Sequence, residues 1–160
     1  MRQICFKEAT SNMSITCDLL DDSAPQSAEF LWQLAQRRSS FDAIHAMWTG
    51  PELSCPLPAS VLPDELSENV IPSENASSYP ESGNIVLASI AEGTFEGLPP
   101  GNFFDIGIFY GDGGRMLMPF GWIDVNVCAQ IVASDLEHAK SCINAIRQTG
   151  ACTLSIEPAE

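Results

Sequence analysis

Seven side chains are candidates for holding a small ligand, because they are hydrogen-bonding or aromatic groups. A histidine titrates near neutral pH, so His45 could act as a general base or as a hydrogen-bonding group for a ligand. The alternative is an ordinary histidine in the semi-buried interior of a barrel. The full set is His45, Trp48, Glu74, Asn75, Tyr110, Arg115 and Trp122.

Arg115 is one of only seven basic residues, and it follows a glycine-rich turn in a stretch that also holds Trp122 and other aromatic residues. The planar guanidinium group can donate to both oxygens of a carboxylate at once. The sequence therefore predicts that Arg115 clamps a carboxylate. The alternative is an ordinary ion pair with Asp105, Asp112 or Asp124.

Two acidic positions lie at loop edges that prolines set. Glu52 follows Gly50-Pro51, and Glu74 with Asn75 follows Pro72. One interpretation is the rim of a pocket for a polar ligand. The other is local, because asparagine stabilises turns through hydrogen bonds to the backbone and loop glutamates are usually solvated.

Motifs of known catalytic or metal sites are absent from the sequence. It has no Gly-x-Ser-x-Gly, and no Lys-Ser or Lys-Thr follows the GDGG at 111–114. The six cysteines include no Cys-x-x-Cys pair, which favours buried thiols in a reducing compartment over disulfides or a metal site. We expect no metal and no cofactor.

The composition argues against several partners. Seven basic and 21 acidic residues give a formal net charge of −14, which repels phosphate groups, so neither nucleic acid nor an anionic membrane is expected as a partner. The first twenty residues lack the basic head and apolar stretch of a signal peptide, and no long apolar run follows. We therefore expect a cytoplasmic protein.

The first half of the chain predicts a β-hairpin, a helix and a strand. Apolar residues alternate on both sides of Ser11-Asn12, and Ser23 with Gln26 predicts a capping box that opens a helix ending near Arg38. Residues 41–49 alternate as a strand. The proline-rich segment at 51–80 predicts neither a long helix nor a central strand, and it could cover a pocket as a lid.

The second half predicts strands at 84–91, 105–110 and 122–132, a return strand at 115–118 that makes a hairpin with 105–110, and a last strand at 152–156. Between the last two strands, Ser134 with Glu137 opens a helix that ends at Gly150. We expect one domain over 1–160. It should be a mainly β, mostly antiparallel barrel, closed or nearly closed, with two peripheral helices.

Four segments carry a family resemblance across the whole chain: SAPQSAEFLWQLA, AMWTGPEL, IPSENASSYPESGNI and IGIFYGDGG. With the order of elements, they resemble a family of uncharacterised bacterial proteins with a cyclophilin-like barrel. The resemblance implies the fold. Cyclophilins are peptidyl-prolyl isomerases whose site uses a Phe-x-Arg string, which this chain lacks, so we do not expect isomerase activity.

Three hypotheses of function follow. The leading one is a protein that binds a small organic carboxylate or amide in a pocket at the barrel mouth. This hypothesis favours a binding protein over an enzyme. The second is an enzyme that acts on such a ligand with His45 or Glu74 as general acid or base. The third is a non-catalytic homo-oligomer that assembles through the aromatic strands at 115–122.

Overall fold

The computed structural model describes residues 1–160 and is mainly β, as the alternating apolar residues predict. The strands are β1 (Gln3–Glu8), β2 (Met13–Leu19), β3 (Ser40–His45), β4 (Glu52–Pro58), β5 (Ala76–Ser77), β6 (Asn84–Ile90), β7 (Phe103–Phe109), β8 (Leu117–Met118), β9 (Gly121–Trp122), β10 (Val125–Ile131) and β11 (Ala151–Pro158). The helices are α1 (Pro25–Gln36), α2 (Asp64–Ser67) and α3 (Leu136–Thr149), with 3₁₀ turns at Ala59–Val61 and Ala133–Asp135.

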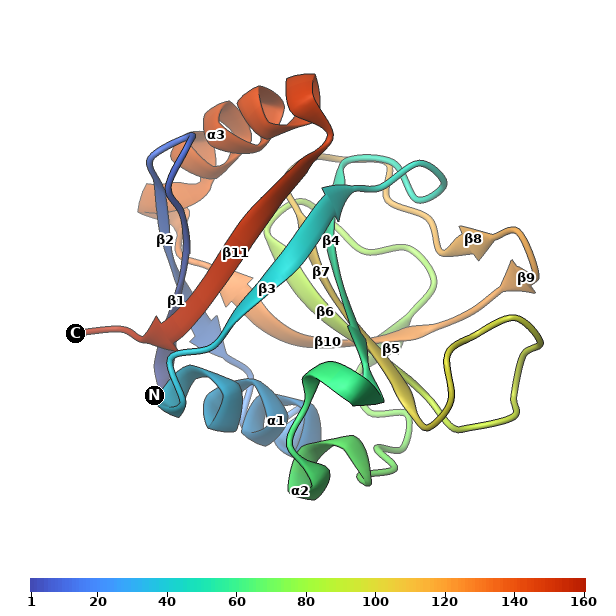
Figure 1. Cartoon of the computed structure of the whole chain (residues 1–160). Helices are drawn as coiled ribbons and strands as arrows, with labels where there is room; N and C mark the ends of the chain where they lie inside the picture. The colour runs from blue at the N-terminus through green and yellow to red at the C-terminus, as the bar shows by residue number, and fades with distance from the viewer.

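Eight strands close into an antiparallel barrel (Figure 1). Their order is β2-β1-β11-β3-β4-β7-β6-β10, and β10 pairs with β2 to close the ring. β5 adds a short ninth strand beside β10. The closed antiparallel barrel confirms the predicted fold class. Because β1 pairs with β11, the two ends of the chain lie close together.

The main core lies inside the barrel and under the two long helices, which pack at opposite ends of it (Figure 1). Alternate strand residues such as Ile4, Phe6 and Ile15 point inward, as the period of two requires. α1 adds an apolar stripe that includes Phe30 and Leu34. Because apolar side chains fill the interior of the barrel, a polar site has to lie on its outer surface.

A second, smaller apolar cluster lies on the outer face of the sheet. It consists of Val86, Ala88, Phe109, Met116 and Val125, with Met118, Ile123 and Val127 packed against it. Strands β6, β7 and β10 supply part of this cluster, and the segment around β8 and β9 covers it. These strands therefore carry apolar residues on both of their faces.

The predicted hairpin between 105–110 and 115–118 is wrong. β7 pairs with β4 and β6, whereas Leu117–Met118 pairs with Gly121–Trp122 in a two-stranded arm of its own. The glycine-rich turn lets the chain leave the sheet instead of returning along it. The arm projects from one side of the barrel (Figure 1).

The proline-rich segment is more regular than predicted. It begins with β4, a barrel strand that contains Pro56 and Pro58. β3 pairs with β4 only as far as Ser54, so both prolines lie where one edge of β4 has no partner strand. A proline is tolerated there because no ladder hydrogen bond needs its missing N–H. A third helix, α2, also lies in this segment.

The element boundaries need three further corrections. β3 ends at His45, so Trp48 lies in the following loop and not in the strand. The strand predicted at 122–132 begins only at Val125. Neither long helix is opened by a side-chain cap, so both predicted capping boxes are wrong, although Gly150 ends α3 in the left-handed conformation as predicted.

No helix in the structure is both long and apolar enough to cross a membrane. All six cysteines are free thiols, and five of them are buried. Cys17 and Cys128 have pKa values raised by burial, which fits thiols that pack in a core and do not react.

Candidate functional site

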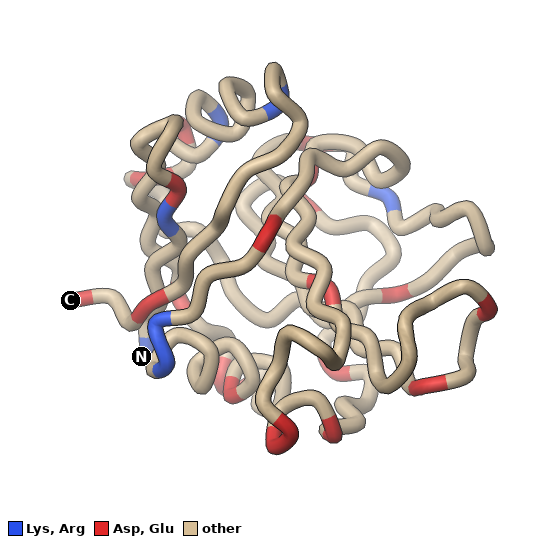
Figure 2. The backbone as a smooth tube through the Cα atoms, in the orientation of Figure 1, with Lys and Arg blue, Asp and Glu red and all other residues tan.

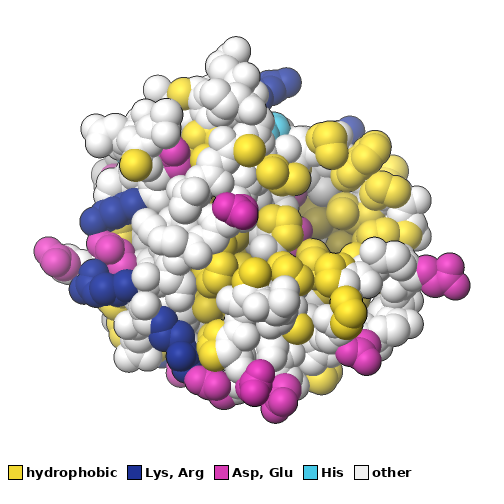
Figure 3. Space-filling model, in the orientation of Figure 1, with side chains coloured by type: hydrophobic (Ala, Val, Ile, Leu, Met, Phe, Trp, Pro, Cys, Tyr) yellow, Lys and Arg dark blue, Asp and Glu magenta, His cyan; other side chains and the backbone are white.

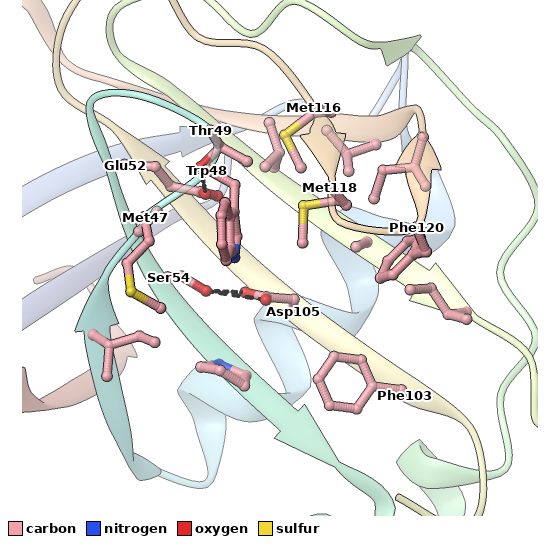
Figure 4. A pocket seen from close by; sticks show the side chains of 18 of the residues that line it. Met47, Trp48, Thr49, Glu52, Ser54, Phe103, Asp105, Met116, Met118 and Phe120 are labelled. Carbon is pink, nitrogen blue, oxygen red and sulfur yellow. Dashed lines mark hydrogen bonds between the residues drawn. The ribbon is translucent and has the colours of Figure 1, made fainter. Parts of the chain in front are cut away.

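An apolar cavity of about 220 Å³ lies on the outer face of the barrel, between the sheet and the β8–β9 arm (Figure 4). Figure 3 shows hydrophobic side chains gathered around a hollow in this part of the surface. Nineteen residues line the cavity and 14 of them are hydrophobic. They are Ile44, Ala46, Met47, Trp48, Thr49, Glu52, Ser54, Pro56, Val86, Ala88, Ile90, Leu98, Phe103, Asp105, Met116, Met118, Phe120, Ile123 and Val125.

Strand alternation decides which residues reach the cavity. Glu52 and Ser54 of β4 face the cavity, as does Asp105 of β7, while Leu53 and Cys55 point into the main core. A shift of one residue in register would exchange these two sets. Glu52, Ser54 and Asp105 are therefore held in the cavity by paired strands of the barrel.

Flexible and aromatic side chains form the outer wall. Met116, Met118 and Phe120 come from the segment of the arm, and Met47 and Trp48 come from the loop after β3 (Figure 4). Met47 is 75% exposed and Trp48 is 52% exposed, so this wall is open to solvent. Methionine adapts to ligands of different shape, and an indole ring offers a flat apolar surface.

Two carboxyl groups with hydroxyl partners form the polar base of the cavity. The Thr49 hydroxyl donates to Oε1 of Glu52, and the Ser54 hydroxyl lies 2.9 and 3.0 Å from the two oxygens of Asp105 (Figure 4). A Cβ atom at Gly107 would stand 2.0 Å from Oε2 of Glu52. Glycine at 107 thus leaves the space that the Glu52 carboxyl group occupies.

Burial makes both carboxyl groups hard to ionise. Burial, together with repulsion from the nearby Asp105 carboxylate, raises the pKa of Glu52 to about 8. Burial also raises the pKa of Asp105, although this side chain keeps partial exposure to the cavity. At neutral pH the pair therefore holds a proton that surface carboxyl groups would have lost.

Such a pair can do two kinds of chemistry. When ionised, it attracts a cation or accepts hydrogen bonds from N–H groups inside an apolar cavity. When protonated, a carboxyl group can donate a hydrogen bond or a proton near neutral pH, as a general acid does. A perturbed carboxyl pair in a concave apolar site is typical of functional sites.

The seven predicted site residues do not gather in one place. Trp48 lines the cavity, but His45, Tyr110 and Arg115 line a separate shallow hollow that also contains Arg147. His45 Nε2 lies 2.6 Å from the Tyr110 hydroxyl. Burial lowers the pKa of His45, so the neutral imidazole is favoured.

The other three predicted residues lie away from the cavity. Glu74 accepts a hydrogen bond from the Ser27 N–H in the first turn of α1, and the Asn75 side chain donates to the Val127 carbonyl. Trp122 is exposed on the arm and packs against Tyr79, with ring centroids 5.5 Å apart. These contacts are structural, which matches the local interpretation of Asn75.

Three polar residues at the base of the cavity, Glu52, Ser54 and Asp105, are not among the seven predicted site residues. The sequence suggests Glu52 only as part of a pocket rim and Asp105 only as an ion-pair partner of Arg115, and it does not mark Ser54. The available signal was an acid in each of two otherwise apolar strands, ELSCPLP and FFDIGIF. A charged residue at such a position must be satisfied or functional.

No group of three or more His, Cys, Asp or Glu side chains is placed to hold a metal ion. The hydroxyl groups of Thr49 and Ser54 are hydrogen-bond partners of Glu52 and Asp105. The cavity therefore offers two carboxyl groups within apolar walls, which suits an organic ligand better than a bare divalent cation.

The comparisons with known proteins identify a family and a fold. Residues 8–157 match a family model described as "Protein of unknown function (DUF3830)". No curated protein matches the chain. Solved structures that match have a cyclophilin-like fold, which confirms the fold that the resemblance implied.

Two of these structures are similar over nearly the whole chain. "Structure of McbB in complex with tryptophan" has a TM-score of 0.65 at 14% identity, and the match covers 96% of this chain and 44% of McbB. This chain thus spans less than half the length of McbB. "Crystal Structure of the Mimivirus Cyclophilin" has a TM-score of 0.52 at 13% identity and covers 98% of this chain and 86% of that one.

Proposed function

We propose that this chain, which belongs to the DUF3830 family of proteins of unknown function, binds a small organic amine or amide in the cavity on the outer face of its barrel. The observation that carries the proposal is the pair of carboxyl groups, Glu52 and Asp105, at the base of a cavity whose walls are almost entirely apolar. The ligand would have an apolar body and at least one N–H donor.

The chemistry of the cavity favours an amine over a carboxylate. A ligand carboxylate would be a third acidic group beside two that already repel each other, whereas an ammonium group would be attracted to them. The net charge of −14 also favours the approach of a cation. An amide N–H group can donate to the same carboxyl oxygens. Of the two ligand classes predicted from the sequence, the amide therefore remains, and an amine takes the place of the carboxylate.

The walls favour a flat apolar body. Trp48, Phe103 and Phe120 surround the open side, and aromatic faces pack well against rings and attract cations. McbB, a protein of the same fold, is described in complex with tryptophan, a molecule with both an aromatic ring and an amino group. An aromatic amine is therefore the first ligand class to test.

The test compares three indole probes by isothermal titration calorimetry: tryptamine, which carries an ammonium group, 3-methylindole, which is neutral, and indole-3-acetate, which carries a carboxylate. We expect tryptamine to bind most tightly and indole-3-acetate most weakly. Glu52→Gln and Asp105→Asn should each weaken tryptamine binding about tenfold, because each removes a charge-assisted partner. Glu68→Gln, an exposed glutamate at the end of α2, is the matched control.

The pH dependence adds a second check. Raising the pH from 6 to 8.5 ionises the carboxyl pair while an alkylamine keeps its proton, so tryptamine affinity should rise across this range and 3-methylindole affinity should not. Indole-3-acetate binding as tightly as tryptamine, or tryptamine affinity unchanged in both variants, would overturn the proposal.

A second candidate function is acid–base catalysis by the same pair. The raised pKa of Glu52 gives it a proton to donate near neutral pH within an apolar site, as a general acid needs. Glu52 takes the place of His45 and Glu74 as the proposed general acid. The His45 Nε2 is hydrogen-bonded to the Tyr110 hydroxyl, and the Glu74 carboxylate is hydrogen-bonded to the first turn of α1. A probe that is chemically unchanged after incubation with the protein supports binding alone.

A further inference from the structure

The basic residues of the chain are distributed unequally between paired and free positions. Five of the seven form ion pairs with carboxylates: Arg2, Lys7, Arg37, Arg38 and Lys140. Arg115 and Arg147 form none, although acidic residues outnumber basic ones by 21 to seven. The predicted alternative of an ion pair for Arg115 is therefore wrong.

These two unpaired arginines lie together. Both line one shallow hollow, to which Arg115 comes from the loop after β7 and Arg147 from the last turn of α3. Figure 2 shows basic segments on α3 and on the loop that leads to β8, apart from those near the termini. A cation in the last turn of α3 also suits the helix dipole, but the dipole does not account for a second arginine on another segment.

His45 and Tyr110 line the same hollow. His45 Nδ1 lies 3.0 Å from the Ala46 carbonyl oxygen, which can only accept, so Nδ1 carries a proton. In the neutral ring Nε2 is then an acceptor, and the Tyr110 hydroxyl donates to it over 2.6 Å. This bond orients the tyrosine hydroxyl within the hollow that the two arginines also line.

We infer that this hollow, lined by Arg115, Arg147, His45 and Tyr110, is a second site that binds the carboxylate group of a small molecule. The inference does not depend on the cavity at Glu52 and Asp105. Two guanidinium forks offer planar pairs of donors, which match the two oxygens of a carboxylate. The other five basic residues are all ion-paired, so this hollow is where the protein brings its two unpaired cations together.

The charge of the hollow selects a monoanion. Asp112 also lines it, so the two arginines leave one net positive charge around the site when His45 is neutral. A carboxylate neutralises that charge, while a phosphate dianion would leave an excess negative charge beside Asp112. The site should therefore prefer acetate to inorganic phosphate at pH 8.

The test follows the arginine Nε–H signals and the His45 ring signals by NMR during titration with sodium acetate, at constant ionic strength set with sodium chloride. We expect saturable shifts at Arg115, Arg147 and His45 with acetate, weaker ones with inorganic phosphate, and none with chloride alone. Arg115→Gln and Arg147→Gln should each raise the Kd for acetate about tenfold, because each removes a charged donor pair.

The controls separate this site from general screening of charge. Arg37→Gln removes an exposed arginine that pairs with Glu65 on the other side of the fold, and it should leave the Kd for acetate unchanged. Both Arg115 and Arg147 are exposed, so their variants should keep the wild-type fold. Equal acetate binding in both variants, the same shifts with chloride, or tighter binding of phosphate than of acetate would each overturn the inference.

Discussion

The buried carboxyl group of Glu52 has an effect on folding opposite to that of a surface ion pair. Its side chain is only 5% exposed, and its pKa in the folded protein lies above the ordinary value of 4.5, at about 8. The folded state therefore holds a proton over a pH range in which the unfolded state has released it. By linkage, this group makes the protein more stable at low pH and less stable as the pH rises through that range.

The first prediction follows at the scale of this residue. Glu52→Gln removes the titration, so the variant should gain stability relative to the wild type between pH 5 and pH 8.5, by about 1.4 kcal/mol for each unit of pKa difference removed. The measurement is urea unfolding of both proteins at several pH values. If the free energy of unfolding depends on pH in the same way in both proteins, the raised pKa is contradicted. Glu68→Gln, which replaces an exposed glutamate, is the control variant.

Among the elements, α1 shows how a helix can begin without a capping side chain of its own. Its N-cap is Ala24, it has no acidic residue in its first turn, and no side chain of its own caps it. The carboxylate of Glu74, 47 residues away, accepts the Ser27 N–H over 2.6 Å. Asn126 joins the same network by donating to the Ser27 hydroxyl. A distant loop thus does the work of a capping residue and also brings negative charge to the helix N-terminus.

The second prediction concerns this contact. Glu74→Ala should lower the free energy of unfolding by about 1 kcal/mol, as the loss of a helix cap does, because the Ser27 N–H loses its acceptor. The exposed Glu68 is again the control, and Glu68→Ala should be close to neutral. Chemical denaturation measures the first effect, and calorimetry with tryptamine should show unchanged affinity. If Glu74→Ala instead lost tryptamine affinity without a change in the free energy of unfolding, Glu74 would be a ligand-binding residue.

For the whole molecule, charge and apolar surface act in opposite directions. Trp48, Phe120 and Trp122 are between 41% and 52% exposed on one side of the barrel, which could support the homo-oligomer of the third hypothesis. A net charge of −14 makes two copies repel each other. The proposed ligand also needs the open side of the cavity to be free.

The third prediction is therefore a monomer. Size-exclusion chromatography with light scattering should give a mass near 17.3 kDa in 150 mM salt. A dimer that Phe120→Ser or Trp48→Ser dissociates would instead favour assembly through this surface and would count against an open cavity. The suitable control is Val70→Ser, because Val70 is exposed. Trp32→Ser is unsuitable because Trp32 packs against the main core.

The strands were predictable to the extent that one face of each is apolar. Period-two alternation predicts the β1–β2 hairpin, and the helical period predicts α1 and α3, because these patterns depend only on which side of an element is buried. Which strands pair over long distances in the sequence was harder to predict. The local pattern predicts a hairpin of 105–110 with 115–118, but in the barrel β7 lies between β4 and β6.

The site was harder to predict than the fold. Trp48 was predicted as part of the pocket and does line the cavity, and His45, Tyr110 and Arg115 do lie together, but in another hollow. Glu52 and Asp105 are 53 positions apart in the sequence, and nothing local marks them as neighbours. They meet because β4 pairs with β7 in a register that places both on the outer face.

The sequence by itself therefore determined the mainly β class, a mostly antiparallel barrel, the inward face of most strands and the acidic net charge. These depend on composition and on short-range periodicity. Only the tertiary structure decided that the cavity lies outside the barrel under the β8–β9 arm, that two acids share it, and that the two unpaired arginines share another hollow. The physical reason is that burial and charge proximity arise from strand register and chain crossing, which join residues far apart in the sequence.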